Sequence, residues 1–468
     1  MGNNKIKVND LKKINYKNNQ SRSLAINIMT RQFKHMSKEE KLRLLQDVQN
    51  NPESYCSHEL LSPLAESFCE KIEVRDFEEF QLLKDFGMLQ VFGQNQIENS
   101  AIRQMELAMK LPISIKGALM PDAHHGYGLP IGGVLAVKNA VIPYGVGLDI
   151  GCRMALTICN LGPDYLKRYG YQVKNALHDY THFGIEGALG FAQEHEVLDR
   201  VEFHETDLLR KLHPKAVRQL GSSGTGNHFV EFGLVEMLDG NAFKLPVGTY
   251  VGILSHSGSR GMGATIAQYY TQKAMDKCKL PKHAQQLAWL DLDSEPGQEY
   301  WRAMNLAGSY AKACHDRIRI NLSKALGLEI LTVIENHHNF AWKEVTAEGE
   351  TLIVHRKGAT PAANGEPGII PGNMIDPGYI VTGKGNEASL CSASHGAGRK
   401  MSRSKARESI TNSSLKKMLQ GKGVALIGGS PEESPLAYKN IDEVMNHQKM
   451  LVNVEGKFYP KIVRMHKE

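Results

Sequence analysis

The sequence predicts a mixed α/β protein with α+β character, and three observations support this class. Short apolar runs, many of them rich in β-branched residues, recur from residue 118 onward. Stretches with helical spacing separate some of these runs, as at 264–277 and 300–326. The spacing of the runs is irregular and does not follow repeated βαβ units, which argues against a doubly wound sheet. The runs are ALM (118–120), GGVLAV (132–137), MALTIC (154–159), YVGILSH (250–256), LTVIEN (331–336), TLIVHR (351–356), YIVTG (379–383) and GVALIGG (423–429).

The N-terminal part has a different composition. Residues 1–35 are rich in Lys and Asn and contain one acid, Asp10. They suit either an arm that touches RNA or a solvated tail, and the solvated tail is the favoured interpretation. Ser37 and Glu40 form a capping box that predicts a short helix ending at Asn51-Pro52, and residues 58–86 also have a helical pattern. We therefore expect a mostly helical N-terminal extension over 1–85, of unknown role, followed by one large domain over 86–468.

Length and composition set broad limits. The 468 residues suffice for two or three average domains or one large one, and 41% hydrophobic with 23% charged residues is ordinary for a soluble globular protein. The formal net charge of +6 is compatible with a polyanionic partner without establishing one. The seven cysteines are odd in number and include no C-x-x-C, which favours a reducing, cytoplasmic location over a disulfide scaffold. No signal peptide or membrane span is expected.

Several strand-like runs adjoin polar, Gly-flanked motifs that contain metal-ligand residue types. GVGLDIGCR carries Asp149 and Cys152, GTGNHF carries His228, HSGSRG carries His256 and HHNFAW carries His338. Thiolate, imidazole and carboxylate groups that converge in space could hold two metal ions, a geometry suited to phosphoryl chemistry. Each residue alone also fits a structural role, and spacing cannot show convergence. Composition by itself points to zinc.

The stretch SASHGAGRKMSR (392–403) places His395 among small residues, with Arg399 and Arg403 just after it. Glycines let backbone N–H groups approach a ligand closely, and such groups together with arginine suit phosphate. A structural histidine in a Gly-rich turn fits the same letters. These residues alone leave both interpretations open.

Together these motifs resemble the RNA-splicing ligase RtcB family over roughly residues 90–468. The resemblance rests on PDAHHGYGLPIGG, GVGLDIGC, GTGNHF, HSGSRG, HHNFAWKE, HRKGATPA, GIIPGNM, SHGAGRKMSR and AYKNIDEVM, in this order. It implies a single large α/β-type domain of the family's own fold. It also implies a ligase that uses GTP and two Mn²⁺ ions, so that manganese replaces the zinc suggested by composition, with zinc kept as an inhibitory occupant.

The resemblance assigns roles to individual positions. Asp149, Cys152, His228, His256 and His338 fall on metal ligands, with Cys152 bridging the two ions. His395 falls on the histidine that becomes guanylylated, and Asp122 is our candidate for the carboxylate that fixes its tautomer. The nucleotide-contacting positions are Asn227, Phe229, Glu231, Asn339, Gly396, Ala397, Gly398, Tyr438 and Lys467, with Tyr438 and Lys467 flanking the guanine.

The implied reaction joins RNA ending in a 2′,3′-cyclic phosphate or 3′-phosphate to RNA with a 5′-hydroxyl, in tRNA splicing or RNA repair. RNA, GTP and an archease-type activator are the expected partners. Two alternatives are a metal-dependent phosphodiesterase that opens cyclic phosphates without ligation, and a non-catalytic RNA-binding homologue. His395, Tyr438 and Lys467 argue against the first, and the complete set of metal ligands argues against the second.

Two positions depart from the family pattern. Arg153 follows Cys152 where the family usually has glycine, so we expect a reshaped turn or an added phosphate contact. The loop PGNMIDPGY has Asn373 in place of serine and Ile375–Gly378 after it, which could change the triphosphate contacts or the preference for GTP. With the N-terminal extension, these departures suggest a divergent branch that repairs a particular damaged RNA.

Overall fold

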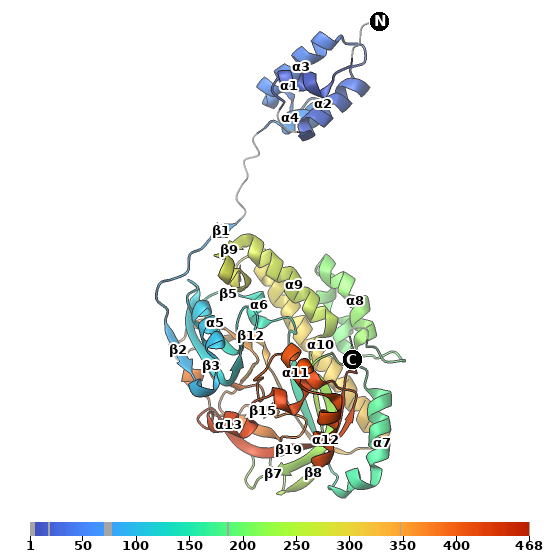
Figure 1. Ribbon diagram of the computed structural model, residues 1–468, viewed down its shortest axis with the longest axis vertical. Coiled ribbons are helices and arrows are strands. Elements are labelled where there is room, and N and C mark those ends of the chain that lie inside the picture. The colour runs from blue at the N-terminus through green and yellow to red at the C-terminus, as the bar shows by residue number, and fades with distance from the viewer. Residues whose placement is uncertain (1–4, 17–18, 70–76, 185–186, 347, 468) are drawn as a thin grey trace. The chain divides into compact units, whose positions relative to one another are not determined.

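The structure, a computed structural model, describes residues 5–16, 19–69, 77–184, 187–346 and 348–467. Its contacts divide the chain into two compact units, Met1–Asp76 and Phe77–Glu468 (Figure 1). Residues 77–85, which we expected in the extension, belong to the second unit. They do so because β1 (Glu78–Glu79) pairs in parallel with β9 (Cys278–Lys279).

The first unit is a small helical body with its own apolar core. Its helices are α1 (Val8–Lys13), α2 (Asn19–Arg31), α3 (Lys38–Asn50) and α4 (Ser62–Glu66). Leu11, Tyr16, Met29, Leu45 and Leu64 are buried together in this core. The solvated tail expected for residues 1–35 is therefore wrong for their described part, because its apolar residues recur at helical spacing and find partners in α3 and α4.

The capping box at the start of α3 is confirmed. The backbone N–H of Glu40 donates to Ser37 Oγ at 3.3 Å, and the backbone N–H of Ser37 donates to Glu40 Oε2 at 2.7 Å. The helix expected over 58–86 is realised only as the short α4, since residues 77–86 form β1 and irregular backbone. Part of that range, 70–76, lies outside the described residues.

The second unit contains an eight-stranded sheet with the order β11-β6-β8-β7-β19-β16-β15, in which β18 also pairs with β19. All pairs are antiparallel apart from β18 with β19. The expected runs within it form strands. The strands are β6 (Arg153–Cys159), β7 (Phe229–Met237), β8 (Gly248–Ser257), β11 (Ile330–His337), β15 (Pro367–Ile370), β16 (Gly378–Gly383), β18 (Ala425–Ile427) and β19 (Val452–Met465).

A five-stranded sheet with the order β12-β13-β4-β3-β2 lies in the same unit. Its strands are β2 (Met88–Val91), β3 (Ser114–His124), β4 (Ile131–Val137), β12 (Asn339–Val345) and β13 (Thr351–Lys357). Two short pairs complete the strands, β5 (Ala140–Val141) with β10 (Leu290–Asp291) and β14 (Ala359–Pro361) with β17 (Ser392–Ser394). The mixed α/β class is thus confirmed.

Helices cover the sheets and create the cores. The helices are α5 (Asn99–Met109), α6 (Pro143–Val146), α7 (Asp164–Tyr180), α8 (Asp207–Gln219), α9 (Arg260–Lys277), α10 (Glu295–Leu326), α11 (Arg403–Ser409), α12 (Asn412–Gly421) and α13 (Ile441–Asn446). Leu177 of α7 and Ile318 of α10 pack on Phe232 and Ile253 of the eight-stranded sheet. Among the described residues, no helix combines the length and the apolar character that a membrane crossing needs.

Candidate active site

A cavity of about 290 Å³ opens in the second unit, where the two sheets meet. All the site residues expected from the sequence line it, with two exceptions. Asp122 lies behind the wall and is fully buried. Lys467 is exposed at the end of the described chain and is not a lining residue. The motifs that lie about a hundred residues apart in sequence therefore meet at one site.

Sheet topology explains how the metal-ligand residue types meet. Strands β11, β6, β8 and β7 are consecutive neighbours. Cys152 directly precedes β6, His338 directly follows β11 and His228 directly precedes β7, while His256 is the penultimate residue of β8. Because each neighbouring pair is antiparallel, the start of one strand lies beside the end of the next. All four side chains consequently reach the same edge of the sheet.

The donor atoms of this group are close together. Cys152 Sγ lies 3.2 Å from His256 Nε2 and 3.5 Å from His228 Nε2. His256 Nε2 lies 3.3 Å from His338 Nε2, and His228 Nε2 lies 2.9 Å from Asp149 Oδ2. The atoms of Cys152, His228 and His256 all fall within 4.8 Å of one another. This set of one thiol, three imidazoles and one carboxylate has the chemistry of a transition-metal site.

Burial keeps two of these histidines neutral. Burial lowers the pKa of His256 and His338 well below the usual value, so that their ring nitrogens offer lone pairs. The Nδ1 of His256 donates to the backbone oxygen of Asn227 at 3.0 Å, which leaves Nε2 as the free donor atom. Burial also raises the pKa of the Cys152 thiol well above its usual value, so a cation is needed to hold the thiolate.

Asp149 behaves differently from the thiol beside it. Burial by itself raises the pKa of Asp149, but the neighbouring His228 outweighs burial and holds that pKa below its usual value. Its carboxylate is thus ready to bind a cation. Gly258 packs directly against this carboxylate, since a Cβ at Gly258 would lie 1.9 Å from Asp149 Oδ1. Glycine at position 258 therefore leaves the space that the Asp149 carboxylate occupies.

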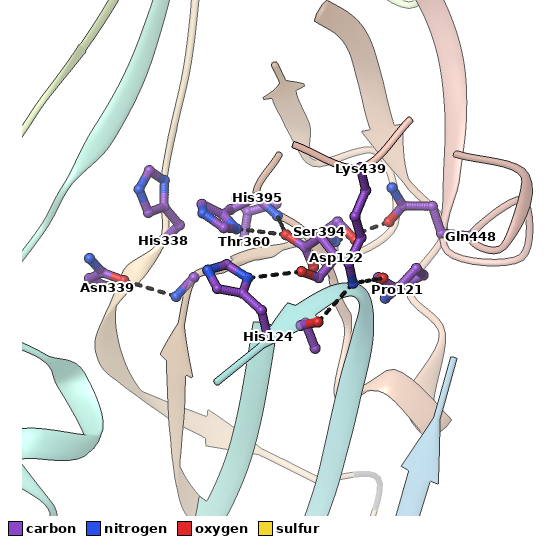
Figure 2. Close-up of polar contacts among 12 residues, drawn as sticks. Pro121, Asp122, His124, His338, Asn339, Thr360, Ser394, His395, Lys439 and Gln448 are labelled. Atoms are coloured by element: carbon purple, nitrogen blue, oxygen red, sulfur yellow. Dashed lines mark hydrogen bonds and ion pairs between the residues drawn. The ribbon is translucent and has the colours of Figure 1, made fainter. Parts of the chain in front are cut away.

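His395 lies on the other side of His338, with 4.9 Å between the ring centroids. Its Nδ1 lies 2.7 Å from Asp122 Oδ2, and its backbone N–H donates to the same oxygen at 3.2 Å (Figure 2). Burial raises the pKa of Asp122, but the contact with His395 outweighs it and lowers the pKa. An ionised Asp122 selects the tautomer with the proton on Nδ1, which leaves Nε2 with a free lone pair.

The turn after His395 requires glycine. Gly398 has φ +71°, and a Cβ there would lie 2.1 Å from the backbone oxygen of Asp122. The Gly-rich stretch of the motif thus brings the loop against the strand that carries Asp122. With Gly396 and Ala397, it forms the wall of the cavity next to His395.

Two residues that the sequence analysis missed support this pair. Lys439 Nζ donates to the backbone oxygens of Pro121 and Ala123 at 3.1 and 2.8 Å, on either side of Asp122 (Figure 2). Gln448 Oε1 accepts the backbone N–H of Ser394 at 3.0 Å. Lys439 stands in the AYKNIDEVM motif, where it could have been noticed, whereas nothing in the letters around Gln448 marks it.

Phe229, Glu231 and Tyr438 also line the cavity. Burial raises the pKa of Glu231 well above its usual value, because the low-dielectric surroundings disfavour the charged carboxylate. Asn339 is a residue that we expected to contact the nucleotide, and its side-chain amide makes two hydrogen bonds to backbone atoms. Its Nδ2 donates to the backbone oxygen of Asp149 at 3.2 Å, and its Oδ1 accepts the N–H of Gly358 at 2.9 Å.

Glu433 is a further residue that the sequence analysis did not find. Its carboxylate is 3% exposed and accepts from the Tyr438 hydroxyl. Arg399 Nη1 lies 3.2 Å from Oε2, and Arg403 Nε lies 3.5 Å from Oε1. Arg399, Arg403, Glu433 and Tyr438 all line the cavity. One buried carboxylate therefore orients two guanidinium groups and a phenol at this wall.

Both departures from the family pattern have a structural account. Arg153 turns away from the cavity, and its Nη1 lies 2.5 Å from Glu335 Oε2, so the expected alternative of a phosphate contact is not realised. The left-handed turn is taken instead by Gly151, with φ +68°. Asn373 closes the altered loop by accepting the N–H groups of Ile375 and Asp376 at 3.0 and 3.1 Å.

Comparison with known proteins gives a consistent result. A family model described as tRNA-splicing ligase RtcB matches residues 104–465, a range that contains every expected site residue except Lys467. The RNA-splicing ligase RtcB of Escherichia coli (strain K12) is 34% identical over 388 residues, covering 76% of this chain and 92% of the relative. The tRNA-splicing ligase RtcB of Nanoarchaeum equitans (strain Kin4-M) is 30% identical over 439 residues, covering 78% and 91%. That of Thermococcus kodakarensis is 30% identical over 413 residues, covering 73% and 86%.

Proposed function

We propose that this chain, which belongs to the RtcB family and is an RNA ligase, uses GTP to join RNA 2′,3′-cyclic phosphate or 3′-phosphate ends to 5′-hydroxyl ends. The observation that carries the proposal is the buried contact between Asp122 and His395, beside the Cys/His cluster. We place this activity in the cytoplasm, in tRNA splicing or RNA repair, with an archease-type activator as a partner.

His395 is the proposed nucleophile. Asp122 accepts a hydrogen bond from Nδ1–H of His395, so that the lone pair of Nε2 attacks the α-phosphorus of GTP. A nitrogen–phosphorus bond forms while the bond to the leaving pyrophosphate breaks. The negative charge of Asp122 stabilises the positive charge that the ring acquires. Gly396, Ala397 and Gly398 offer backbone N–H groups to the phosphate oxygens beside His395.

The GMP then passes to an oxygen of the RNA 3′-phosphate, and the nitrogen–phosphorus bond to His395 breaks. The 5′-hydroxyl oxygen attacks the activated RNA phosphorus, GMP leaves, and the hydroxyl proton goes to solvent. A cyclic phosphate is first opened by addition of water. Arg399 and Arg403 line the cavity and would neutralise the RNA phosphate during these steps.

The donor set fits the two Mn²⁺ ions that we propose. Asp149, Cys152, His228, His256 and His338 would hold them, with Cys152 between the two. The Nε2 atoms of His228 and His338 face the other donors of the cluster, while their Nδ1 atoms are buried without a hydrogen-bond partner among the described residues. Bound there, the ions would neutralise charge on the phosphate oxygens. The same donors suit zinc, which we expect to compete for the site.

We place the nucleotide against the wall formed by Asn227, Phe229, Glu231 and Tyr438. The Glu231 carboxyl would hydrogen-bond to the base, and the Tyr438 ring would stack on it. Lys467 would close the site from the C-terminal end, and Asn339 would act through the backbone that it positions.

Guanylylation tests the proposal directly. Purified protein is incubated with Mn²⁺ and GTP labelled at the α-phosphate, without RNA, and separated on a denaturing gel beside His395→Ala. Label on the wild type and none on the variant is the expected result. If folded, metal-loaded wild type takes no label, the GTP-dependent mechanism is wrong.

A further inference from the structure

The positive charge of this protein is concentrated in one short segment. Residues 399–422 contain eight Lys and Arg and one acid, Glu408, a net charge of +7. The whole chain has a net charge of +6, so all the other residues together contribute about −1. The segment comprises the end of the His395 motif and helices α11 and α12 (Figure 1).

The arginines and lysines of this segment have different surroundings. Arg399, Arg403 and Arg407 form ion pairs with the buried carboxylates of Glu432 and Glu433. The lysines are exposed and make no ion pair with any residue that the structure describes. They are Lys400, Lys405, Lys416, Lys417 and Lys422. Arg399 and Arg403 are thus held at the cavity wall, whereas the lysines present uncompensated charge to solvent.

The inner faces of both helices pack on the cavity wall. Leu415 and Leu419, one helical turn apart on α12, are buried against Met465 and Met374. Ala406 of α11 is buried beside Tyr438. Met374, Met465 and Tyr438 line the cavity. The lysines therefore cover the outer surface of the same wall that carries Arg399 and Arg403 on its inner side.

We infer that the lysine face of α11 and α12, formed by Lys405, Lys416, Lys417 and Lys422, binds backbone phosphates of the single-stranded RNA whose end enters the cavity. The inference rests on the proposed function and names the path of its RNA substrate. Lysine is a mobile point charge that binds phosphates without reading the base sequence, as a ligase acting on broken ends requires.

RNA fits this face better than a membrane surface does. A helix that lies on a membrane inserts large apolar side chains beside its lysines. Among the described residues, none of the exposed large apolar side chains falls within 399–422. The charge is also continuous with Arg399 and Arg403 at the cavity, where the proposed reaction places an RNA phosphate.

The test uses full-length protein in which these four lysines are changed to Gln. Affinity for a short single-stranded RNA with a 3′-phosphate is measured across a series of KCl concentrations, without GTP. The slope of log K against log salt is negative, and each lost phosphate contact reduces its magnitude by about 0.7. We expect this magnitude to fall by about 1.4 to 2.8, which corresponds to two to four contacts. The matched control changes Lys174, Lys211, Lys282 and Lys324, four exposed lysines elsewhere in the second unit, to Gln.

Self-guanylylation without RNA separates this inference from the proposed function. The α11–α12 variant is expected to accept GMP on His395 at the wild-type rate and to bind RNA with the reduced slope. A slope within about 0.5 of wild type, or an equal fall in the control, would overturn the inference. If the wild type takes no label, the proposed GTP mechanism is wrong. The salt dependence of RNA affinity would still test the lysine face in that case.

Discussion

Asp122→Asn is the most informative substitution, because it keeps the shape of the side chain and removes its charge. Oδ2 of Asp122 faces both Nδ1 and the backbone N–H of His395, and Oδ1 has no hydrogen-bond partner among the described residues. Asparagine can keep its oxygen toward His395 and bury an unpaired NH₂ group. Otherwise it can flip, donate to Nδ1 and force the ring proton onto Nε2. The first orientation loses charge stabilisation, and the second removes the nucleophilic lone pair.

The expected loss follows from these two orientations. Each orientation leaves one buried donor unpaired, the NH₂ group in the first and the backbone N–H of His395 in the second, and such a donor costs about 1–3 kcal/mol. Loss of the correct tautomer and of the carboxylate charge in such a pair lowers rates by roughly 10²–10⁴-fold. At about 1.4 kcal/mol for each factor of ten, this is about 3–5.5 kcal/mol of transition-state stabilisation. We expect the guanylylation rate to fall in this range while Mn²⁺ still binds.

The assay is the single-turnover rate of label transfer from α-labelled GTP at saturating GTP and Mn²⁺. Ser394→Ala is the matched control, since Ser394 is also fully buried beside His395 but its hydroxyl has no hydrogen-bond partner in the described part of the chain. That variant should stay within a few-fold of wild type. An Asp122→Asn enzyme that reacts within threefold of wild type, with unchanged thermal stability, would refute the role that we give to Asp122.

Three further predictions follow from local geometry. Gly258→Ala should weaken Mn²⁺ binding by about 10–100-fold, measured by calorimetry, because its Cβ would occupy the position of the Asp149 carboxylate. In the wild type, the free energy of unfolding should rise with pH between about pH 7 and 9. In Lys357→Met this rise should be smaller, as measured by urea unfolding at a series of pH values. Burial lowers the pKa of Lys357 to about 7, so the folded protein releases a proton that the unfolded chain keeps. Oxidised glutathione should link Cys56 to Cys69, whose sulfur atoms lie 3.3 Å apart, and make the tryptic peptide 44–71 about 2 Da lighter.

For each of these three predictions, a particular result would contradict the reasoning. Gly421→Ala should bind Mn²⁺ normally, because among the described residues its Cβ would meet nothing within 4 Å apart from its chain neighbours and its own helix backbone; equal weakening in both variants would remove the steric argument. A parallel pH profile for wild type and Lys357→Met would mean that this lysine stays charged. Addition of glutathione to both thiols of the peptide 44–71, without loss of 2 Da, would show that the two sulfur atoms do not meet.

Local patterns in the sequence were sufficient for much of the fold. The Ser37–Glu40 capping box and the apolar runs of β4, β6 and β8 specify elements through contacts within a few residues. The extension is helical as expected, but the tail predicted for residues 1–35 was wrong for a related reason. Its apolar residues are diluted by Lys and Asn, so that the composition of residues 1–35 suggested a tail, whereas the helical spacing that buries Leu11 decided the outcome.

Residue chemistry by itself determined which groups of this protein could bind a metal or act as a nucleophile, because thiolate, imidazole and carboxylate groups carry their reactivity in their own atoms. Only the tertiary structure decided which of them meet. The antiparallel neighbours β11, β6, β8 and β7 bring Cys152 and its histidine partners to one sheet edge. Arg153 is a residue type that can bind phosphate, but it forms an ion pair with Glu335 on the neighbouring strand. Glu433 meets Arg399 and Arg403 far from them in sequence, and no short-range pattern connects these residues, since burial is set by contacts distant in sequence.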